Sequence, residues 1–234
     1  MTRRAGHARL CGLALVGMAL VFAALVVQHD EATALGPLAA DYVRLSVADL
    51  AIPNVTTAIL LAYRSFDTLG EVAVLFMVAA SLKPLLAPLP ETIRVAAPRL
   101  SPTPGEIVES GHQALLPLIA VFGAYVVLFG HLSAGGGFQG GAIIATGVAF
   151  FMLARVATSL PLDQFSAVES LAGLGVIALG LAGLVWAGGF LDPRILPPGE
   201  FGALISGGAI PIFSLLLGVK VAAELSVVLE RFRA

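Results

Sequence analysis

The chain has 234 residues, of which 58% are hydrophobic and only 12% are charged. Soluble domains carry about 25% charged residues, so this composition excludes an ordinary soluble protein and indicates an integral membrane protein. The net charge of −2 provides no basic surplus for binding nucleic acid. The single cysteine, Cys11, excludes a disulfide framework and a metal site built from cysteines.

Six apolar runs follow one another along the chain. Each is long enough to cross a hydrocarbon core of about 30 Å, which takes roughly 20 helical residues. The predicted fold class is therefore an all-α membrane protein with about six transmembrane helices. The expected spans are Leu10–Gln28, Phe66–Leu86, Gln113–Leu132, Phe138–Thr158, Val168–Gly188 and Phe201–Val228.

The first apolar run has an alternative interpretation as a cleaved signal peptide. Basic residues precede it, and Ala32-Thr33-Ala34 resembles a cleavage site. Its apolar stretch, Leu10–Val27, is longer than the usual signal core of about 7–15 residues. Asp30 and Glu31 also stand just before the supposed cut. We therefore expect this run to remain as a membrane anchor.

The distribution of lysine and arginine predicts how the chain is oriented. If the N-terminus is cytoplasmic, ten of the 13 lysines and arginines fall on the cytoplasmic side. Only Arg44, Arg64 and Arg194 then fall on the outer side. Because cytoplasmic segments of membrane proteins carry an excess of these residues, both termini are predicted to be cytoplasmic.

Five prolines between residues 88 and 105 predict a division of the chain, because proline removes helical hydrogen bonds and stiffens a connection. We predict that residues 1–87 form a two-span module with a long outer loop, residues 88–105 a proline-rich cytoplasmic linker, and residues 106–234 a four-span bundle. In the outer loop, Asp41–Leu50 predicts a short surface helix, and Asn54–Tyr63 predicts a segment along the membrane interface. An equally weighted alternative for both is a loop that packs on a neighbouring protein.

The segment His131–Gly141, reading HLSAGGGFQGG, lies between the third and fourth spans and holds five glycines in eleven residues. Irregular backbone near a bilayer is tolerated only where protein or a water-filled cavity covers it. We expect a tight re-entry between two membrane helices here. A G-x-G-x-x-G match within it carries no nucleotide site, because no strand precedes it, and neither a metal nor a cofactor is expected. The predicted turn consists of Gly135, Gly136, Gly137, Phe138, Gln139, Gly140 and Gly141.

Two carboxylates open the second span. Asp67 and Glu71 are four residues apart, so both lie on one helical face. Arg64 is close enough to pair with Asp67, and Glu71 lies about one turn deeper. Ionisable groups inside a membrane are costly and usually face a protein interior or a hydrated path. Two interpretations remain: a structural ion pair near the outer interface, and a role for Glu71 in a proton or cation route.

Three further ionisable residues are candidates for the same route. Lys220 and Glu224 are four residues apart in the sixth span and can pair along one face. They form either a terminal ion pair or a contact with a charged path in a neighbouring subunit. His131 beside the turn can titrate near neutral pH, although a hydrogen bond at a helix end is the plainer role. His131 and His112 bracket the third span and cannot bind one ion together.

Small residues and one proline predict how the helices pack. Gly141, Ala145 and Ala149 recur every fourth residue in the fourth span, as Ala178 and Ala182 do in the fifth. Such faces let helices approach closely in lipid. Pro211 is expected to kink the sixth span.

Two motifs resemble a known family. The run GHLSAGGGFQGG, Gly130–Gly141, followed by an apolar helix, resembles the signature of the MnhB (MrpB) subunit of multisubunit Na+/H+ antiporters. This resemblance covers roughly Ser101–Val228, with Ala134 where that family commonly has proline. The run YRSFDTLGE, Tyr63–Glu71, resembles the segment at the C-terminal end of the large MnhA subunit. A similar piece is a small separate subunit in membrane-bound hydrogenases.

The resemblance implies a subunit of a Na+/H+ antiporter complex in the cell membrane, with other Mrp-type subunits as partners and Na+ and H+ as transported ions. It also implies that Glu71 matches a glutamate associated with the ion route. The predicted ion path consists of Glu71, Asp67, His131, Lys220 and Glu224. One alternative is a membrane-arm subunit of a redox-driven complex beside hydrogenase-like subunits. Another is a purely structural scaffold. The chain itself is not expected to be an enzyme.

Overall fold

The computed structural model describes residues 2–29, 34–85, 105–155 and 158–233. Most of the predicted proline-rich linker and of the supposed cleavage site lies outside these residues. The chain divides into two compact units, Met1–Ala40 and Asp41–Ala234.

The first unit contains α1, Thr2–Gln28, and the beginning of α2, Pro37–Ala48. From Cys11 to Gln28 every side chain of α1 is exposed, and this stretch meets the length and hydropathy of a membrane span. A helix that is apolar on all sides requires lipid or another protein around it.

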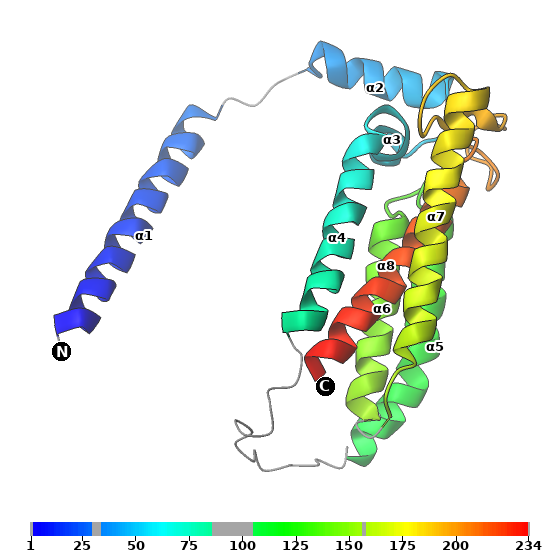
Figure 1. Ribbon diagram of the computed structural model, residues 1–234. Helices are drawn as coiled ribbons and strands as arrows, with labels where there is room; N and C mark the ends of the chain where they lie inside the picture. Colours follow the sequence, from blue (N-terminus) through cyan, green and yellow to red (C-terminus); the bar gives the residue numbers. More distant parts are fainter. Residues whose placement is uncertain (1, 30–33, 86–104, 156–157, 234) are drawn as a thin grey trace. The chain divides into compact units, whose positions relative to one another are not determined.

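The second unit is helical in all its described elements (Figure 1). Among the described residues of the whole chain, six helices, including α1, are long and apolar enough to cross a membrane, and no strand occurs. The all-α prediction with six spans is thus confirmed. After α2 come α3 Val55–Ala58, a π-helix Ile59–Tyr63, α4 Ser65–Leu85, α5 Glu106–Leu128, α6 Gly137–Ala154, α7 Leu162–Trp186, a 3-10 helix Pro193–Ile195 and α8 Ile210–Arg233.

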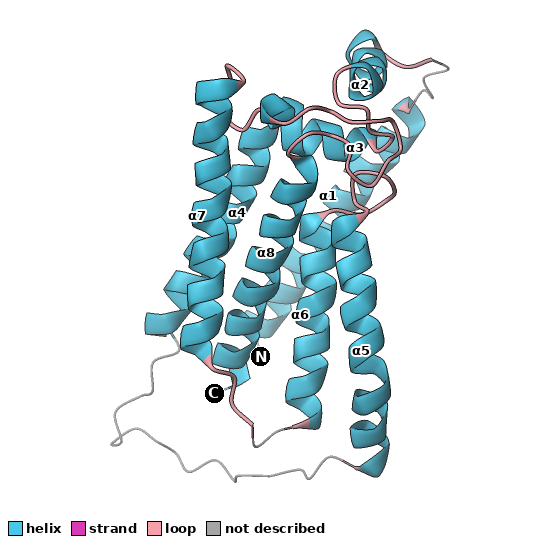
Figure 2. Ribbon diagram, turned by 90° about the vertical axis from the view of Figure 1, so that its right-hand side faces the viewer, coloured by secondary structure: helices cyan, strands magenta, loops and turns pink. Residues whose placement is uncertain are grey.

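Helix α8 is the centre of this unit. It contacts α4, α5, α6 and α7, and Figure 2 shows it running between α6 and α7. Glycines allow this packing: a Cβ on Gly141 would lie 2.7 Å from the carbonyl oxygen of Gly218 in α8. Gly141 and Ala145 are buried, as the small-residue pattern predicts, whereas Ala178 is exposed and takes no part in packing within this chain.

Some of the predicted span limits differ from the helices of the structure. The sixth span begins at Ile210 rather than Phe201, because Gly207 and Gly208 have φ values of 81° and 60° and interrupt any helix before it. Pro211 therefore lies in the first turn, where its missing N–H costs nothing, so this position removes the physical reason for the predicted kink within the span. Helix α5 begins at Glu106, so His112 lies inside that helix rather than at its end.

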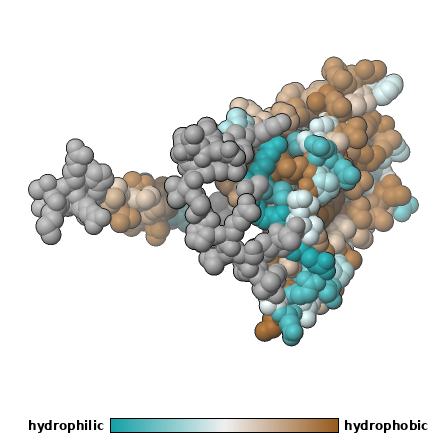
Figure 3. All heavy atoms as spheres, turned by 60° about the horizontal axis from the view of Figure 1, so that its bottom comes forward, coloured by the Kyte–Doolittle hydropathy of each residue, from teal (hydrophilic) through white to brown (hydrophobic). Residues whose placement is uncertain are grey.

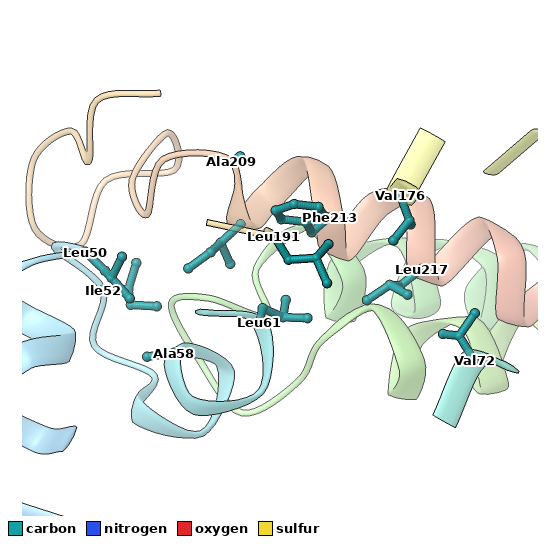
Figure 4. Close-up of a cluster of buried hydrophobic side chains, with 11 residues drawn as sticks. Leu50, Ile52, Ala58, Leu61, Val72, Val176, Leu191, Ala209, Phe213 and Leu217 are labelled. Carbon is teal, nitrogen blue, oxygen red and sulfur yellow. The ribbon is translucent and has the colours of Figure 1, made fainter. Parts of the chain in front are cut away.

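A cluster of buried apolar side chains fixes the segment before α4 over the start of α8 (Figure 4). Ile52, Ala58 and Leu61 pack there with Phe213 and Leu217 of α8. Because burial of these apolar side chains is favourable, the cluster holds the π-helix and α3 in place. Together with the contact between α4 and α8, this segment joins the two sequence halves of the second unit.

Hydrophilic residues gather at the end of the bundle where α5 begins and α6 and α8 end, while the flanks are hydrophobic (Figure 3). Two ion pairs lie at this end: Glu109 with Arg155 at 2.8 Å and Glu230 with Arg233 at 2.7 Å. An apolar flank with a charged end is the surface expected of a membrane-spanning bundle.

Candidate functional site

The glycine turn re-enters the bundle directly after α5. The backbone N–H of Gly136 donates to the carbonyl oxygen of Val126 at 3.1 Å, and α6 begins at the next residue. Gly136 has a φ of 145°, and a Cβ there would meet the side-chain oxygen of Gln139 at 2.8 Å. A Cβ on Gly137 would collide with the carbonyl oxygen of Ser214 in α8. Glycine is therefore required for the turn and for the contact with α8.

Two side chains of the N-terminal half hold this turn. The Asn54 side-chain amide donates to the carbonyl oxygens of Gly130 and Ser133, each at 2.7 Å, and the Thr57 hydroxyl donates to Gly130 at 2.7 Å. Asn54 also caps α3, since its side-chain oxygen accepts from the Thr57 N–H at 3.2 Å. Carbonyls near the end of α5 lack helical partners, so these bonds satisfy them. Neither residue was singled out from the sequence.

Glu71 and the glycine turn line one cavity of about 340 Å³. The carboxylate comes from α4, the hydroxyls of Thr56 and Thr57 come from the segment at α3, and Gln139 comes from α6. The remaining wall consists of Leu60, Leu61, Thr68, Gly135, Gly136, Gly137, Phe138 and Leu217. Residues far apart in the sequence thus line one cavity with a carboxylate, hydroxyl groups and a side-chain amide.

A second hollow adjoins this cavity. It measures about 470 Å³ and includes Asn54, Ser133 and the turn. Thr56, Gly135 and Gln139 border both spaces. These three residues therefore form the shared boundary of the two hollows.

Asp67 and His131, both predicted in the ion path, do not line the Glu71 cavity. Asp67 pairs with Arg64 at 2.5 Å, and both side chains are about half exposed. His131 is fully buried, with its Nε2 3.1 Å from the carbonyl oxygen of Leu204. Burial holds the pKa of His131 below its usual value, so the ring is neutral at pH 7 and Nε2–H donates to Leu204. His131 thereby ties the turn to the loop before α8.

Lys220 and Glu224 form a separate buried cluster with a third residue. Lys220 Nζ lies 3.0 Å from a Glu224 oxygen and 3.3 Å from a Glu169 oxygen of α7. The Nζ also lies 5.6 Å from the centre of the Phe76 ring. Glu169 was missed from the sequence, although a carboxylate beyond the first turn of the apolar α7 was a signal for it.

A cavity of about 360 Å³ reaches Glu169 and Lys220 from between α4 and α7. Its wall is otherwise almost entirely apolar, with Val72, Phe76 and Leu174 among the lining residues. It shares no lining residue with the Glu71 cavity. The predicted ion-path residues are therefore divided between distinct places.

Within the described part of the chain, no group of three or more histidine, cysteine, aspartate or glutamate residues is placed to hold a metal ion. The arrangement at Glu71 offers instead a carboxylate beside hydroxyl and amide groups. Such a set can hold a proton on the carboxylate or bind a hard cation through oxygen.

Comparison with known proteins identifies two family models along the chain. Residues 107–227 match the model described as a domain related to the MnhB subunit of Na+/H+ antiporter. Residues 2–99 match a second model, MbhE, which describes one of the subunits of MBH. An uncharacterised protein of Methanocaldococcus jannaschii is 32% identical over 204 residues, which cover 75% of each protein.

Two solved structures are similar to the whole chain. One is a chain of the membrane-bound sulfane sulfur reductase (MBS), an archaeal respiratory membrane complex, with a TM-score of 0.79 and 30% identity. The match covers 99% of this chain and 98% of that one. The other is a chain of the Mrp complex from a Dietzia species, with a TM-score of 0.77 and 24% identity, which shows a shared fold. That match covers 96% of this chain and 26% of the Dietzia chain.

Proposed function

Because the chain belongs to the family of domains related to the MnhB subunit of Na+/H+ antiporters, we propose that it is an integral-membrane component of a multisubunit complex that exchanges Na+ for protons. The observation that carries this proposal is the cavity that Glu71 and the glycine turn line together. In this role the chain transports only together with its partners, and it catalyses no reaction of its own.

Glu71 supports a role for the cavity in ion movement rather than in packing alone. The residue lies on α4, within the window of that helix that can span a membrane, and it is exposed in the isolated chain. A carboxylate facing acyl chains is costly, so a partner protein or water must cover it in the membrane. Glu71 then lies at a boundary between subunits, where it takes up a proton or a sodium ion in turn.

The adjoining hollow supports a route to that carboxylate. Ions reach Glu71 past Thr56 and Gln139, whose oxygens replace part of the hydration shell. Asn54 and Thr57 keep this passage in shape by fastening the turn. Asp67 and His131 act on the route indirectly, through the ion pair at the start of α4 and the anchored turn.

The proposal places the chain in the cell membrane with both termini in the cytoplasm. Lys220 is buried within α8, so it no longer counts as a cytoplasmic residue, which leaves nine lysines and arginines against three. The asymmetry still favours the same orientation. The Glu71 cavity then lies toward the outer side.

A second candidate function is that of a membrane-arm component of a redox-driven complex. The similarity to a chain of an archaeal respiratory complex over nearly the full length of both chains favours it. In that setting electron transfer belongs to partner proteins, and this chain contributes the same ion route. Identification of the subunits that copurify with the tagged chain separates the two settings.

The test of the ion route is Na+-dependent proton movement in everted vesicles that contain the whole complex. Glu71→Gln removes the charge and keeps the shape, so we expect exchange to be abolished while the complex still assembles. Glu106→Gln, an exposed glutamate at the start of α5, is the matched control and should exchange normally. Unchanged exchange in Glu71→Gln would contradict the role of Glu71 in the ion route and favour a purely structural scaffold.

A further inference from the structure

The charges in the Lys220 cluster do not balance. Glu169 and Glu224 both contact the Lys220 ammonium, at 3.3 and 3.0 Å, and the three side chains are at most 6% exposed. With every group ionised, the cluster would hold two negative charges and one positive charge. A buried carboxylate without a compensating charge is strongly disfavoured, so the cluster must take up one more positive charge.

One oxygen in the cluster lacks a partner. Glu224 is fully buried, and while its Oε2 accepts from Lys220, its Oε1 forms no hydrogen bond. Glu169, by contrast, borders the cavity between α4 and α7. The uncompensated oxygen therefore belongs to the more deeply buried of the two carboxyls.

Apart from Lys83 of α4, whose side chain lies outside the described part of the structure, the titratable groups on the elements around the cluster are exposed or engaged elsewhere. On α8, Arg231 donates to the carbonyl oxygen of Ala79 and Arg233 pairs with Glu230. On α5, Glu109 pairs with Arg155, and His112 packs against Phe151. Glu106 is exposed at the start of the same helix. On α4, Glu71 lines the other cavity and Asp67 pairs with Arg64. Asp163 is exposed at the start of α7, and the sequence of α6 contains no titratable residue.

We propose that this cluster is a proton-holding site, in which Glu224 is a protonated carboxylic acid beside an ionised Lys220–Glu169 pair. The proton is bonded to a Glu224 oxygen and leaves from it unchanged, so no other reactant is needed. Protonation of Glu224 makes the cluster neutral. Lys220 cannot do this alone, because its single positive charge is already shared between two carboxylates. Use of this proton in exchange rests on the proposed function, but its presence does not.

The test is infrared difference spectroscopy on the complex purified through this chain, because the C=O stretch of a carboxylic acid is separate from carboxylate bands. Glu224→Gln should remove one carboxylic acid band relative to the wild type. Glu169→Gln should remove it as well, because a single carboxylate beside Lys220 is already neutralised. Lys220→Met should add a band, since both carboxyls must then be protonated. Glu71→Gln and Glu106→Gln should leave the band in place.

The series stays informative if one variant fails to assemble. Glu224→Gln should be tolerated because glutamine mimics a protonated acid, and Glu169→Gln because residue 169 lies at the edge of the cavity. If one of these variants fails to assemble, the other still tests whether the band is lost. A band that persists in both variants overturns the proposal. So does a band that appears only after sodium is removed, which would identify a bound cation as the missing charge. Loss of exchange in Glu71→Gln leaves this band intact, so the two proposals fail separately.

Discussion

Asn54 donates a side-chain hydrogen bond of 2.7 Å to the carbonyl oxygen of Gly130, across 76 positions of the sequence. The bond joins the N-terminal segment to the turn that starts α6. The same amide also reaches Ser133, so Asn54 and Thr57 together hold the segment at α3 against the glycine turn.

Replacement of Asn54 tests this clamp. Asn54→Ala removes two side-chain donors and the α3 cap, each worth about 1 kcal/mol, so the complex should lose about 2–3 kcal/mol of stability. The measurement is the unfolding temperature of the detergent-solubilised complex. Asn54→Asp keeps the capping oxygen but places a carboxylate against two carbonyls, and it should be at least as harmful. A stable aspartate variant would contradict the donor role.

The contact between α6 and α8 predicts a sharp difference between two glycines. Gly137→Ala forces a methyl group onto the Ser214 carbonyl oxygen, and overpacking of this kind costs about 1–3 kcal/mol. Gly70 on α4 has no atom within 4 Å of its Cβ position, so Gly70→Ala should be neutral or slightly stabilising. Assembly of the complex and its unfolding temperature measure both. Equal tolerance of the two substitutions would argue against close α6–α8 packing.

His131 predicts a dependence of stability on pH. Its pKa in the folded protein is lowered by burial, whereas the unfolded chain has a value near 6.5. The unfolded state therefore binds the proton first, and stability should fall as the pH drops below about 6.5. His131→Gln keeps a donor for Leu204 but does not titrate, so its unfolding temperature should change less between about pH 7 and pH 5. Parallel curves for both proteins would count against this explanation.

Gln139 predicts a defect in ion movement without loss of assembly. It borders both hollows at the turn, and Gln139→Leu places an apolar group where the proposed route passes. We expect initial rates of Na+-dependent proton movement to fall about tenfold, equivalent to about 1.4 kcal/mol. Thr146→Val on the exposed part of α6, where the hydroxyl bonds only to its own helix, is the control. A normal rate of proton movement in Gln139→Leu would show that the ion route does not pass Gln139.

The membrane class, the six spans and the turn could be predicted because each depends on residues adjacent in the sequence. A run such as Cys11–Gln28 is apolar over its whole length, and hydropathy alone identifies it. The glycines of the turn, Gly135–Gly141, likewise show in composition. The pairing of Lys220 with Glu224 follows from a spacing of four on one helix. Helix ends were less predictable: the start of α8 depends on the backbone angles of Gly207 and Gly208.

A helical membrane protein with a glycine turn and few internal charges follows from residue order alone, because these properties are local. Which charges meet depends instead on how the helices pack. That packing placed Glu71 with Gln139 in one cavity, left His131 out of it, and added Glu169 to the Lys220 pair. These relationships depend on contacts between distant segments, which arise when helices pack around α8 and leave no periodic signal in the chain.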